Sequence, residues 1–263
     1  MLADMPTSTL VLWGSATLLT LVLFFRGIIL KQIWQFPFFF LYLFINLLQT
    51  AVGFFLYQGS GFMTADTFPA AWLTQAIVVI TRALAAAEVC YLVLGDYKGV
   101  WAMAARILGA CGLLVLALAL YFGKSGYAHG VMTLEVGLEA AIATGIVGLF
   151  VFARYYEVRV APVTGQLGLG LGILSCFKIV NDLIFETAPR ETPRGWNLAS
   201  SSAFVIILLV WAWALRKPVA VRIRKSIMES AIAYAHLMPQ MNQRLAQLNE
   251  QLAQLWNVES PKP

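Results

Sequence analysis

The sequence predicts an all-α membrane protein, a bundle of seven transmembrane helices followed by a cytosolic amphipathic helix with a short heptad segment. Hydrophobic residues make up 60% of the 263 residues and charged residues only 12%, and the mean hydropathy is +0.77. A soluble domain carries about 25% charged residues. The apolar residues also gather in repeated segments close to the roughly 20 residues that a helix needs to cross about 30 Å of hydrocarbon.

Seven such segments follow one another with short connections, which predicts that neighbouring helices pack antiparallel. The predicted transmembrane domain, residues 1–217, contains helices at about 9–31, 37–57, 70–94, 102–122, 130–153, 165–187 and 196–215. The second helix begins at Pro37, a residue favoured in the first helical turn. No Lys or Arg precedes the first apolar segment and no cleavage signal follows it, so we expect that segment to remain as a membrane anchor.

The basic residues predict the orientation. With the N-terminus outside, eleven Lys and Arg residues flank the inner ends of the helices and three flank the outer ends. The inner set is Arg26, Lys31, Lys98, Arg106, Arg154, Arg159, Arg216, Lys217, Arg222, Arg224 and Lys225, and the outer set is Lys124, Arg190 and Arg194. The positive-inside rule therefore predicts an N-out, C-in protein of the plasma membrane, and we expect a bacterial one.

Residues 218–263 differ in character from the transmembrane domain. Their first part is basic and then amphipathic, and Arg222, Arg224 and Lys225 are predicted to face an anionic inner leaflet. A heptad seam follows, formed by Met241, Leu245, Leu248, Leu252 and Leu255 at spacings of 4, 3, 4 and 3. This helix either packs on its own bundle or on the bilayer, or it mediates self-association or partner contact through residues 240–256. The tail after it is predicted to be disordered.

Seven ionisable side chains lie within the predicted spans, where an uncompensated charge costs at least about 2.5–3.5 kcal/mol. They are Arg82, Glu88, Glu135, Glu139, Lys178, Asp182 and Glu186. We therefore expect them to face the bundle interior and to pair. Glu88 lies nearer the inner end on another face, and we expect it to bond with Arg106 or a tyrosine.

The spacing of these residues predicts one polar cluster that opens toward the outside. Residues 175, 178, 182 and 186 are 3, 4 and 4 apart and share one helix face. Glu135 and Glu139 also share a face and would repel each other unless Arg82 or Lys178 lies near them. The candidate residues for a ligand or ion pocket are Arg82, Glu135, Glu139, Lys178, Asn181, Asp182, Glu186, Asn46 and Gln49. The alternative is a set of structural ion pairs, although such pairs seldom stabilise more than apolar replacements do.

Several functional classes find no support in the sequence. The two histidines, His129 and His236, form no HExxH motif, no triad can be drawn, and no GxSxG motif occurs. We therefore expect no enzyme activity, no bound metal and no cofactor. The positive charge is explained by orientation and lipid contact, so no nucleic-acid partner is expected.

Two stretches carry a resemblance to known proteins. FPFFFLYLF at 36–44 and YLVLGDYKGVWAMAAR at 91–106, after Glu88, are similar to sequences of a group of uncharacterised bacterial seven-helix integral membrane proteins. That resemblance implies the same membrane fold and brings no activity with it. Retinal-binding rhodopsins carry their lysine on the last helix, whereas the last predicted helix here has none before Lys217.

Three functional classes remain. The favoured interpretation is a sensor or receptor-like transducer, with an outward-facing polar pocket for a small-molecule ligand and a cytosolic C-terminal helix for partner contact. The alternatives are a non-catalytic subunit of a membrane complex and a transporter for a small solute or an ion. Against transport, seven spans do not divide into two equal repeats.

Overall fold

The chain divides into two units, Met1–Val219 and Ala220–Pro263. The structure, a computed structural model, describes residues 7–59, 68–124, 126–158, 160–187 and 192–216 of the first unit. Of the second unit it describes only Gln243, Gln247 and Glu250, each in a helical conformation. The predicted lipid-facing residues Arg222, Arg224 and Lys225 and the heptad residues Met241, Leu245, Leu248, Leu252 and Leu255 therefore lie outside the described residues.

All seven predicted helices are present in the first unit, and the described residues contain no strand, so the all-α prediction is confirmed. The helices are α1 (Thr7–Ile29), α2 (Pro37–Gly59), α3 (Phe68–Leu94), α4 (Lys98–Gly123), α5 (Tyr127–Tyr155), α6 (Pro162–Thr187) and α7 (Thr192–Ala214), with a short 3₁₀ helix, η2 (Gln32–Trp34), between α1 and α2. Both α2 and α6 begin with proline, whose missing N–H group needs no partner in a first turn.

Six of these helices, α1 to α6, are long and apolar enough to cross a membrane. Their length and composition indicate a multi-pass membrane protein in a lipid bilayer. The seventh helix has a shorter apolar segment, Leu198–Ala214, because the sequence before it is polar. A seventh span remains a prediction.

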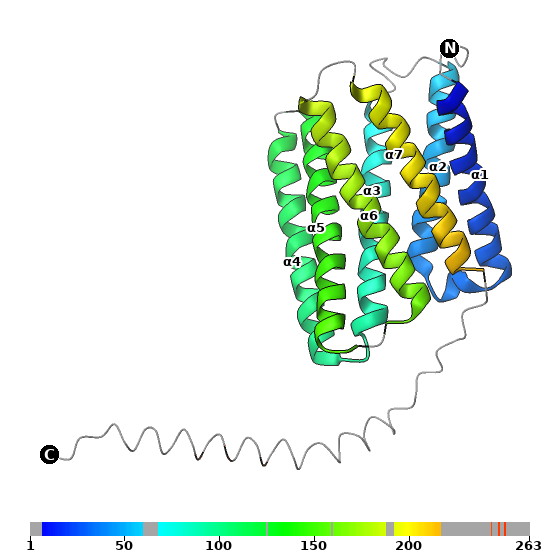
Figure 1. The fold of residues 1–263 in the computed structure, drawn as a ribbon. Helices are drawn as coiled ribbons and strands as arrows, with labels where there is room; N and C mark the ends of the chain where they lie inside the picture. Colours follow the sequence, from blue (N-terminus) through cyan, green and yellow to red (C-terminus); the bar gives the residue numbers. More distant parts are fainter. Residues whose placement is uncertain are drawn as a thin grey trace. The chain divides into compact units, whose positions relative to one another are not determined.

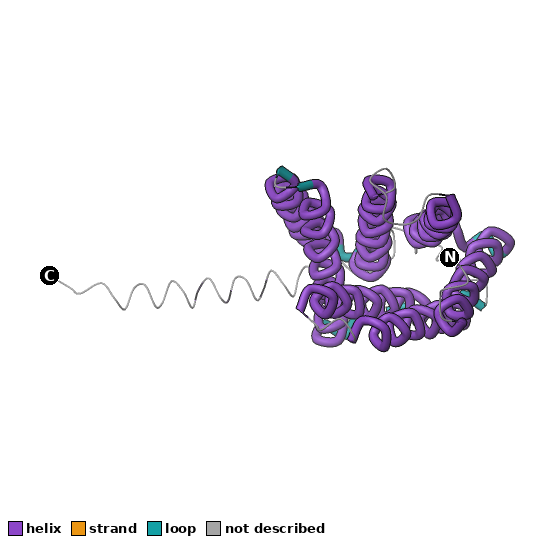
Figure 2. The backbone as a smooth tube through the Cα atoms, turned by 90° about the horizontal axis from the view of Figure 1, so that it is seen from above, coloured by secondary structure: helices purple, strands orange, loops and turns teal. Residues whose placement is uncertain are grey.

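Consecutive helices run in opposite directions (Figure 1), so α1, α3, α5 and α7 begin at the upper end of that view and α2, α4 and α6 begin at the lower end. Six helices pack in a ring in the order α1, α2, α3, α5, α6, α7 and back to α1. The ring is seen from above in Figure 2. The remaining helix, α4, packs mainly on α5 and is the least buried of the six candidate spans, whereas α3 is the most buried and also contacts α6 across the ring.

The lower half of the bundle is closed by an aromatic and aliphatic core. Trp211 of α7 is 0% exposed, and its ring packs edge-on against Phe39 at 5.0 Å and Tyr42 at 6.3 Å between centroids. A Cβ atom on Gly170 would overlap the indole, so this glycine allows α6 to approach α7 closely. This packing joins α2, α6 and α7 directly.

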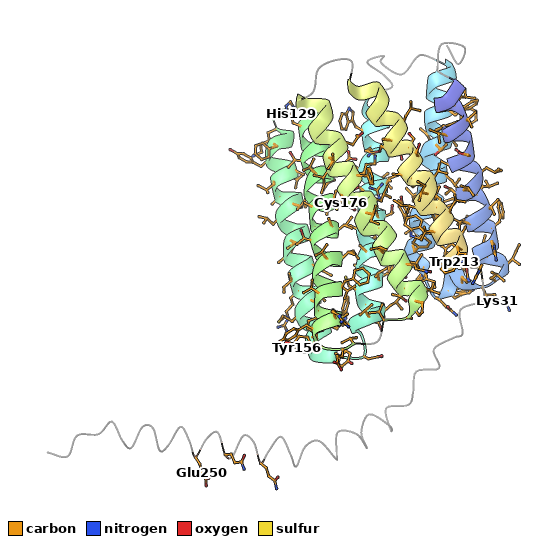
Figure 3. All side chains as sticks on the ribbon, viewed as in Figure 1. Lys31, His129, Tyr156, Cys176, Trp213 and Glu250 are labelled. Atoms are coloured by element: carbon orange, nitrogen blue, oxygen red, sulfur yellow. The ribbon has the colours of Figure 1, made fainter. Side chains whose placement is uncertain are left out.

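Side chains also bind the two residues that follow the lower end of α7, Leu215 and Arg216, whose carbonyl groups have no partner within the helix. The amide Nε2 of Gln32 donates to the Leu215 carbonyl at 3.1 Å, and Arg26 Nη2 donates to the Arg216 carbonyl at 2.6 Å. A cationic donor at a helix C-terminus is also favoured by the helix dipole. Lys31 and Trp213 lie at this same end in Figure 3, opposite to His129.

The upper half of the ring is not closed in this way. Helix α5 is an exception, because Leu134 packs there against Ala119 of α4 and Val79 of α3. In the other five ring helices no described side chain in the upper half is buried, over residues 10–19, 44–55, 71–77, 176–181 and 198–206. Runs of this length cover every face of a helix. Side chains on every face of these described segments are therefore at least partly exposed.

The packing of α1 on α2 yields a stability prediction. A methyl group on Gly27 would overlap the ring of the fully buried Phe40, whereas nothing lies within 4 Å of the corresponding position on Gly14 of the same helix. Overpacking costs about 1–3 kcal/mol, and Gly→Ala in an open helical position gains up to about 1 kcal/mol. We expect Gly27→Ala to lower the thermal unfolding temperature in detergent and Gly14→Ala to leave it unchanged or raise it. Equal effects of the two substitutions would contradict this packing.

Candidate functional site

The centre of the site is an ion pair between α3 and α5. Arg82 donates through Nη1 to Oε1 of Glu139, and the two residues are 3% and 0% exposed. The guanidinium carbon of Arg82 lies 5.3 Å from the ring centroid of Tyr42 on α2, a cation–π distance. We call Tyr42, Arg82 and Glu139 the inner layer.

A second polar layer lies above the first, one turn away on α5 and about two turns away on α2 and α3. Gln49 Nε2 of α2 donates to Gln75 Oε1 of α3 at 2.7 Å, and Gln75 Nε2 donates to Glu135 Oε1 of α5 at 2.5 Å. The ammonium group of Lys178 on α6 is 4.0 Å from the same Glu135 oxygen. These four residues form the outer layer, which joins four helices of the ring.

The two layers follow from helical spacing. Residues three, four or seven apart lie on the same helix face. Each contributing helix carries one such pair, namely Tyr42 and Gln49, Gln75 and Arg82, Glu135 and Glu139, and Ser175 and Lys178. Of the contributing helices, α3 and α5 run downward and α2 and α6 run upward (Figure 1), so the lower-numbered member of each pair lies above on α3 and α5 and below on α2 and α6. The sequence interpretation found the α5 and α6 pairs but missed Gln75 and Tyr42, which the seven-residue spacing from Arg82 and Gln49 could have indicated.

The layers differ in their access to solvent and in how well their polar atoms are satisfied. The Lys178 side chain is 31% exposed and that of Glu135 is 9% exposed, so the outer layer is more accessible than the inner one and lies next to the upper segments without buried side chains. In the inner layer, Arg82 Nε and Glu139 Oε2 are buried without a hydrogen-bond partner, and so is Ser175 Oγ on α6. Unpaired buried polar atoms are costly and call for an explanation such as a bound water, ion or ligand.

The other predicted site residues are placed less fully. Asn46 on α2 and Asn181 on α6 are half-buried and lie one turn from Gln49 and Lys178, respectively. Asp182 and Glu186 lie on α6, but their side chains are outside the described residues. The structure thus brings Arg82, Glu135, Glu139, Lys178 and Gln49 into one cluster; ligand binding by this cluster remains a prediction.

Glu88 is not part of the cluster, and the expectation that it bonds with Arg106 or a tyrosine is wrong. Its carboxylate instead accepts hydrogen bonds from the backbone N–H groups of Phe38 at 3.2 Å and Phe39 at 2.9 Å. It therefore caps the N-terminus of α2, where free N–H groups and the helix dipole favour a negative charge. Sequence spacing could not reveal this contact, because the acceptor and the donors lie on different helices.

The described residues contain no group of three His, Cys, Asp or Glu side chains close enough together to hold a metal ion. His129 is exposed in the first turn of α5, and its carbonyl accepts a hydrogen bond from Thr133. Comparison with known proteins adds no assignment, since no family model matches the chain and no curated protein or solved structure is significantly similar to it.

The ion pair of the inner layer yields the second prediction. Removing one partner of a buried pair leaves an uncompensated charge and costs about 3–5 kcal/mol, whereas removing both is often nearly neutral. We expect Arg82→Met and Glu139→Gln each to lower the free energy of unfolding in detergent by about that amount, and the double variant to recover most of the loss. Additive losses in the double variant would show that the two side chains do not depend on each other. Glu157→Gln, in an exposed turn, is the matched control.

Proposed function

We propose that this protein is a receptor-like membrane protein that binds a small polar ligand at the outer layer, from the upper end of the bundle. The observation that carries the proposal is the position of the Lys178–Glu135 contact. It borders the open upper half on one side and the buried Arg82–Glu139 pair on the other. Ionisable groups within a membrane are costly and are usually retained for function.

The closed lower half favours a receptor over a channel. Below the inner layer, Phe39, Phe40, Leu171, Leu208 and Trp211 are each 0% exposed. Packing of this density among the described residues favours a closed lower half over a water-filled path. A ligand entering from above would therefore reach a blind end against the inner layer.

The proposal includes an orientation and a location. The upper end would face the outside and the lower end the cytoplasm of a plasma membrane, with α7 as a seventh span. Support comes from the excess of Lys and Arg in sequence segments at the lower ends of the helices. The segment after α7 would then lie on the cytoplasmic side, where its heptad leucines would contact a partner or a second copy.

A small-solute transporter is the second candidate, because the charged layers lie within the spans and access is open at one end only. An alternating-access transporter has this form in one of its states. Uptake of a stabilising solute into proteoliposomes would favour transport, whereas stabilisation without uptake would favour a receptor.

Thiol labelling tests both the orientation and the access to the site. In a background with Cys90, Cys111 and Cys176 replaced by alanine, we expect Ser201→Cys to react in intact cells with a membrane-impermeant thiol reagent. Ser201 is half-buried in the upper half of α7, whereas Leu208, two turns lower, is 0% exposed. Leu208→Cys is therefore the control that should remain unlabelled.

Two labelling results would contradict the proposal. Reaction of Ser201→Cys only after the cells are permeabilised would reverse the orientation. A lack of reaction in permeabilised cells as well would show that the upper half is sealed, and the polar layers would then be structural.

Truncation tests the proposed role of the C-terminal segment. A heptad seam of just over two repeats is too short to be stable without packing against another surface. If that surface is a second copy, deleting residues 240–263 should convert an oligomer in detergent to a monomer, as measured by light scattering. An unchanged mass would exclude self-association through this segment.

A further inference from the structure

We propose that the ligand of the outer layer is a short zwitterion, an α- or β-amino acid or a group with the same pattern of charges. This inference rests on the proposed function and adds the chemical class of the ligand. The site would be formed by Glu135 and Lys178, with Gln49 and Gln75 beside them and Ser175 below. The ammonium end of the ligand would face Glu135 and its carboxylate end would face Lys178.

The first argument is the state of the Lys178–Glu135 contact. The ammonium nitrogen and the carboxylate oxygen are 4.0 Å apart, at the outer limit of an ion pair and beyond hydrogen-bonding distance. Glu135 Oε1 already accepts a hydrogen bond from Gln75. Among the charged pairs of the described helices, this loose contact contrasts with the direct, buried Arg82–Glu139 bond. It is therefore the pair that a ligand can reach.

The second argument is electroneutrality. The described charges of the two layers are Arg82 and Lys178 against Glu135 and Glu139, two positive and two negative. In a medium of low dielectric constant, a ligand that takes one member of a loose pair leaves the other uncompensated. An anion bound to Lys178 would leave the negative charge of Glu135 uncompensated. A cation bound to Glu135 would leave the positive charge of Lys178 uncompensated. A zwitterion with its ammonium group at Glu135 and its carboxylate at Lys178 compensates both charges.

The third argument is the supply of neutral hydrogen-bonding groups around the pair. The amides of Gln49 and Gln75 carry both donors and acceptors and can adapt to either end of a dipolar ligand. Ser175 lies three residues before Lys178 on the same face of α6, is 0% exposed, and has a hydroxyl without a partner. Its hydroxyl is thus an unused buried group next to the proposed site. The spacing of the two charges matches a ligand in which amine and carboxylate lie close together.

A matched set of ligands tests this charge pattern. The full-length protein, freed of lipid in detergent, is heated with millimolar glycine, β-alanine, N-acetylglycine or glycinamide. We expect a saturable rise in unfolding temperature with glycine or β-alanine, and dissociation constants at least about tenfold weaker for the anionic N-acetyl and cationic amide derivatives, since each leaves one charge unpaired. Glycerophosphoethanolamine joins the set, because its phosphodiester and ammonium groups carry the same charges as a zwitterionic lipid headgroup. A response to it alone would identify the headgroup as the source.

Variants test whether ligand preference follows the charges of Glu135 and Lys178 or only the stability of the folded protein. Glu135→Gln should shift the preference toward N-acetylglycine, and Lys178→Met should shift it toward glycinamide. The double variant Glu135→Gln/Lys178→Met stays neutral and should lose the response to zwitterions, whereas the charge-swapped Glu135→Lys/Lys178→Glu should retain it. The control Lys124→Met/Glu157→Gln removes one charge of each sign from exposed positions and should respond like the wild type.

The possible results distinguish this inference from the proposed function. Equal or tighter binding of N-acetylglycine or glycinamide to the wild type would overturn the zwitterion and leave a polar ligand site in place. No saturable response to any compound would overturn both. A response to zwitterions that persists in the neutral double variant would show that they bind elsewhere and would also overturn the inference.

Discussion

The buried contact between Arg82 and Glu139 is the constraint on which the arrangement of the bundle depends. Two charges in the interior of a membrane protein must compensate each other, so α3 and α5 can pack only in the register that brings them together. The same register places Gln75, about two turns above Arg82, against Glu135, one turn above Glu139, and the guanidinium lies over the Tyr42 ring of α2. One pair thus constrains the positions of three helices, and α3 is the most buried of the six candidate spans.

The lower half shows how the bundle tolerates an open upper half. Three buried or partly buried side chains satisfy backbone groups of neighbouring helices there: Glu88 at the start of α2, and Gln32 and Arg26 at the end of α7. These bonds tie α1, α2, α3 and α7 together around Trp211. The helices are therefore held at one end, and the upper half can remain accessible without loss of the overall packing. The figures show this continuous bundle (Figures 1 and 3).

The fold was largely predictable, because an apolar segment of about 20 residues has few alternatives to a helix in a membrane. Pairing within one helix face was predictable too, since Glu135 and Glu139 needed Arg82 or Lys178 and each found one of them. Residue spacing within one helix could not predict which residues of different helices contact each other. Gln75 became visible only once α3 was placed against α5, and the partner of Glu88 proved to be the backbone of another helix. Backbone groups carry no sequence signal.

The difference between the two layers gives the site its functional meaning under the proposed function. A ligand changes a protein only through contacts that differ between two conformations. The inner pair is buried and directly hydrogen-bonded, so it can keep α3 and α5 in one register while other contacts change. The outer pair is loose, with 4.0 Å between Lys178 of α6 and Glu135 of α5, although the same two helices pack closely lower down, where Gly172 lies against Ile146. A ligand that replaced this contact by two tighter ones would change the spacing of α5 and α6 while leaving the Arg82–Glu139 register intact. Further down the same helix, Gly170 packs directly against Trp211 of α7, so a displacement of α6 would have to be accommodated by α7 as well. The closed lower half is therefore both the floor of the proposed site and the part of the bundle best placed to pass a change on to α7.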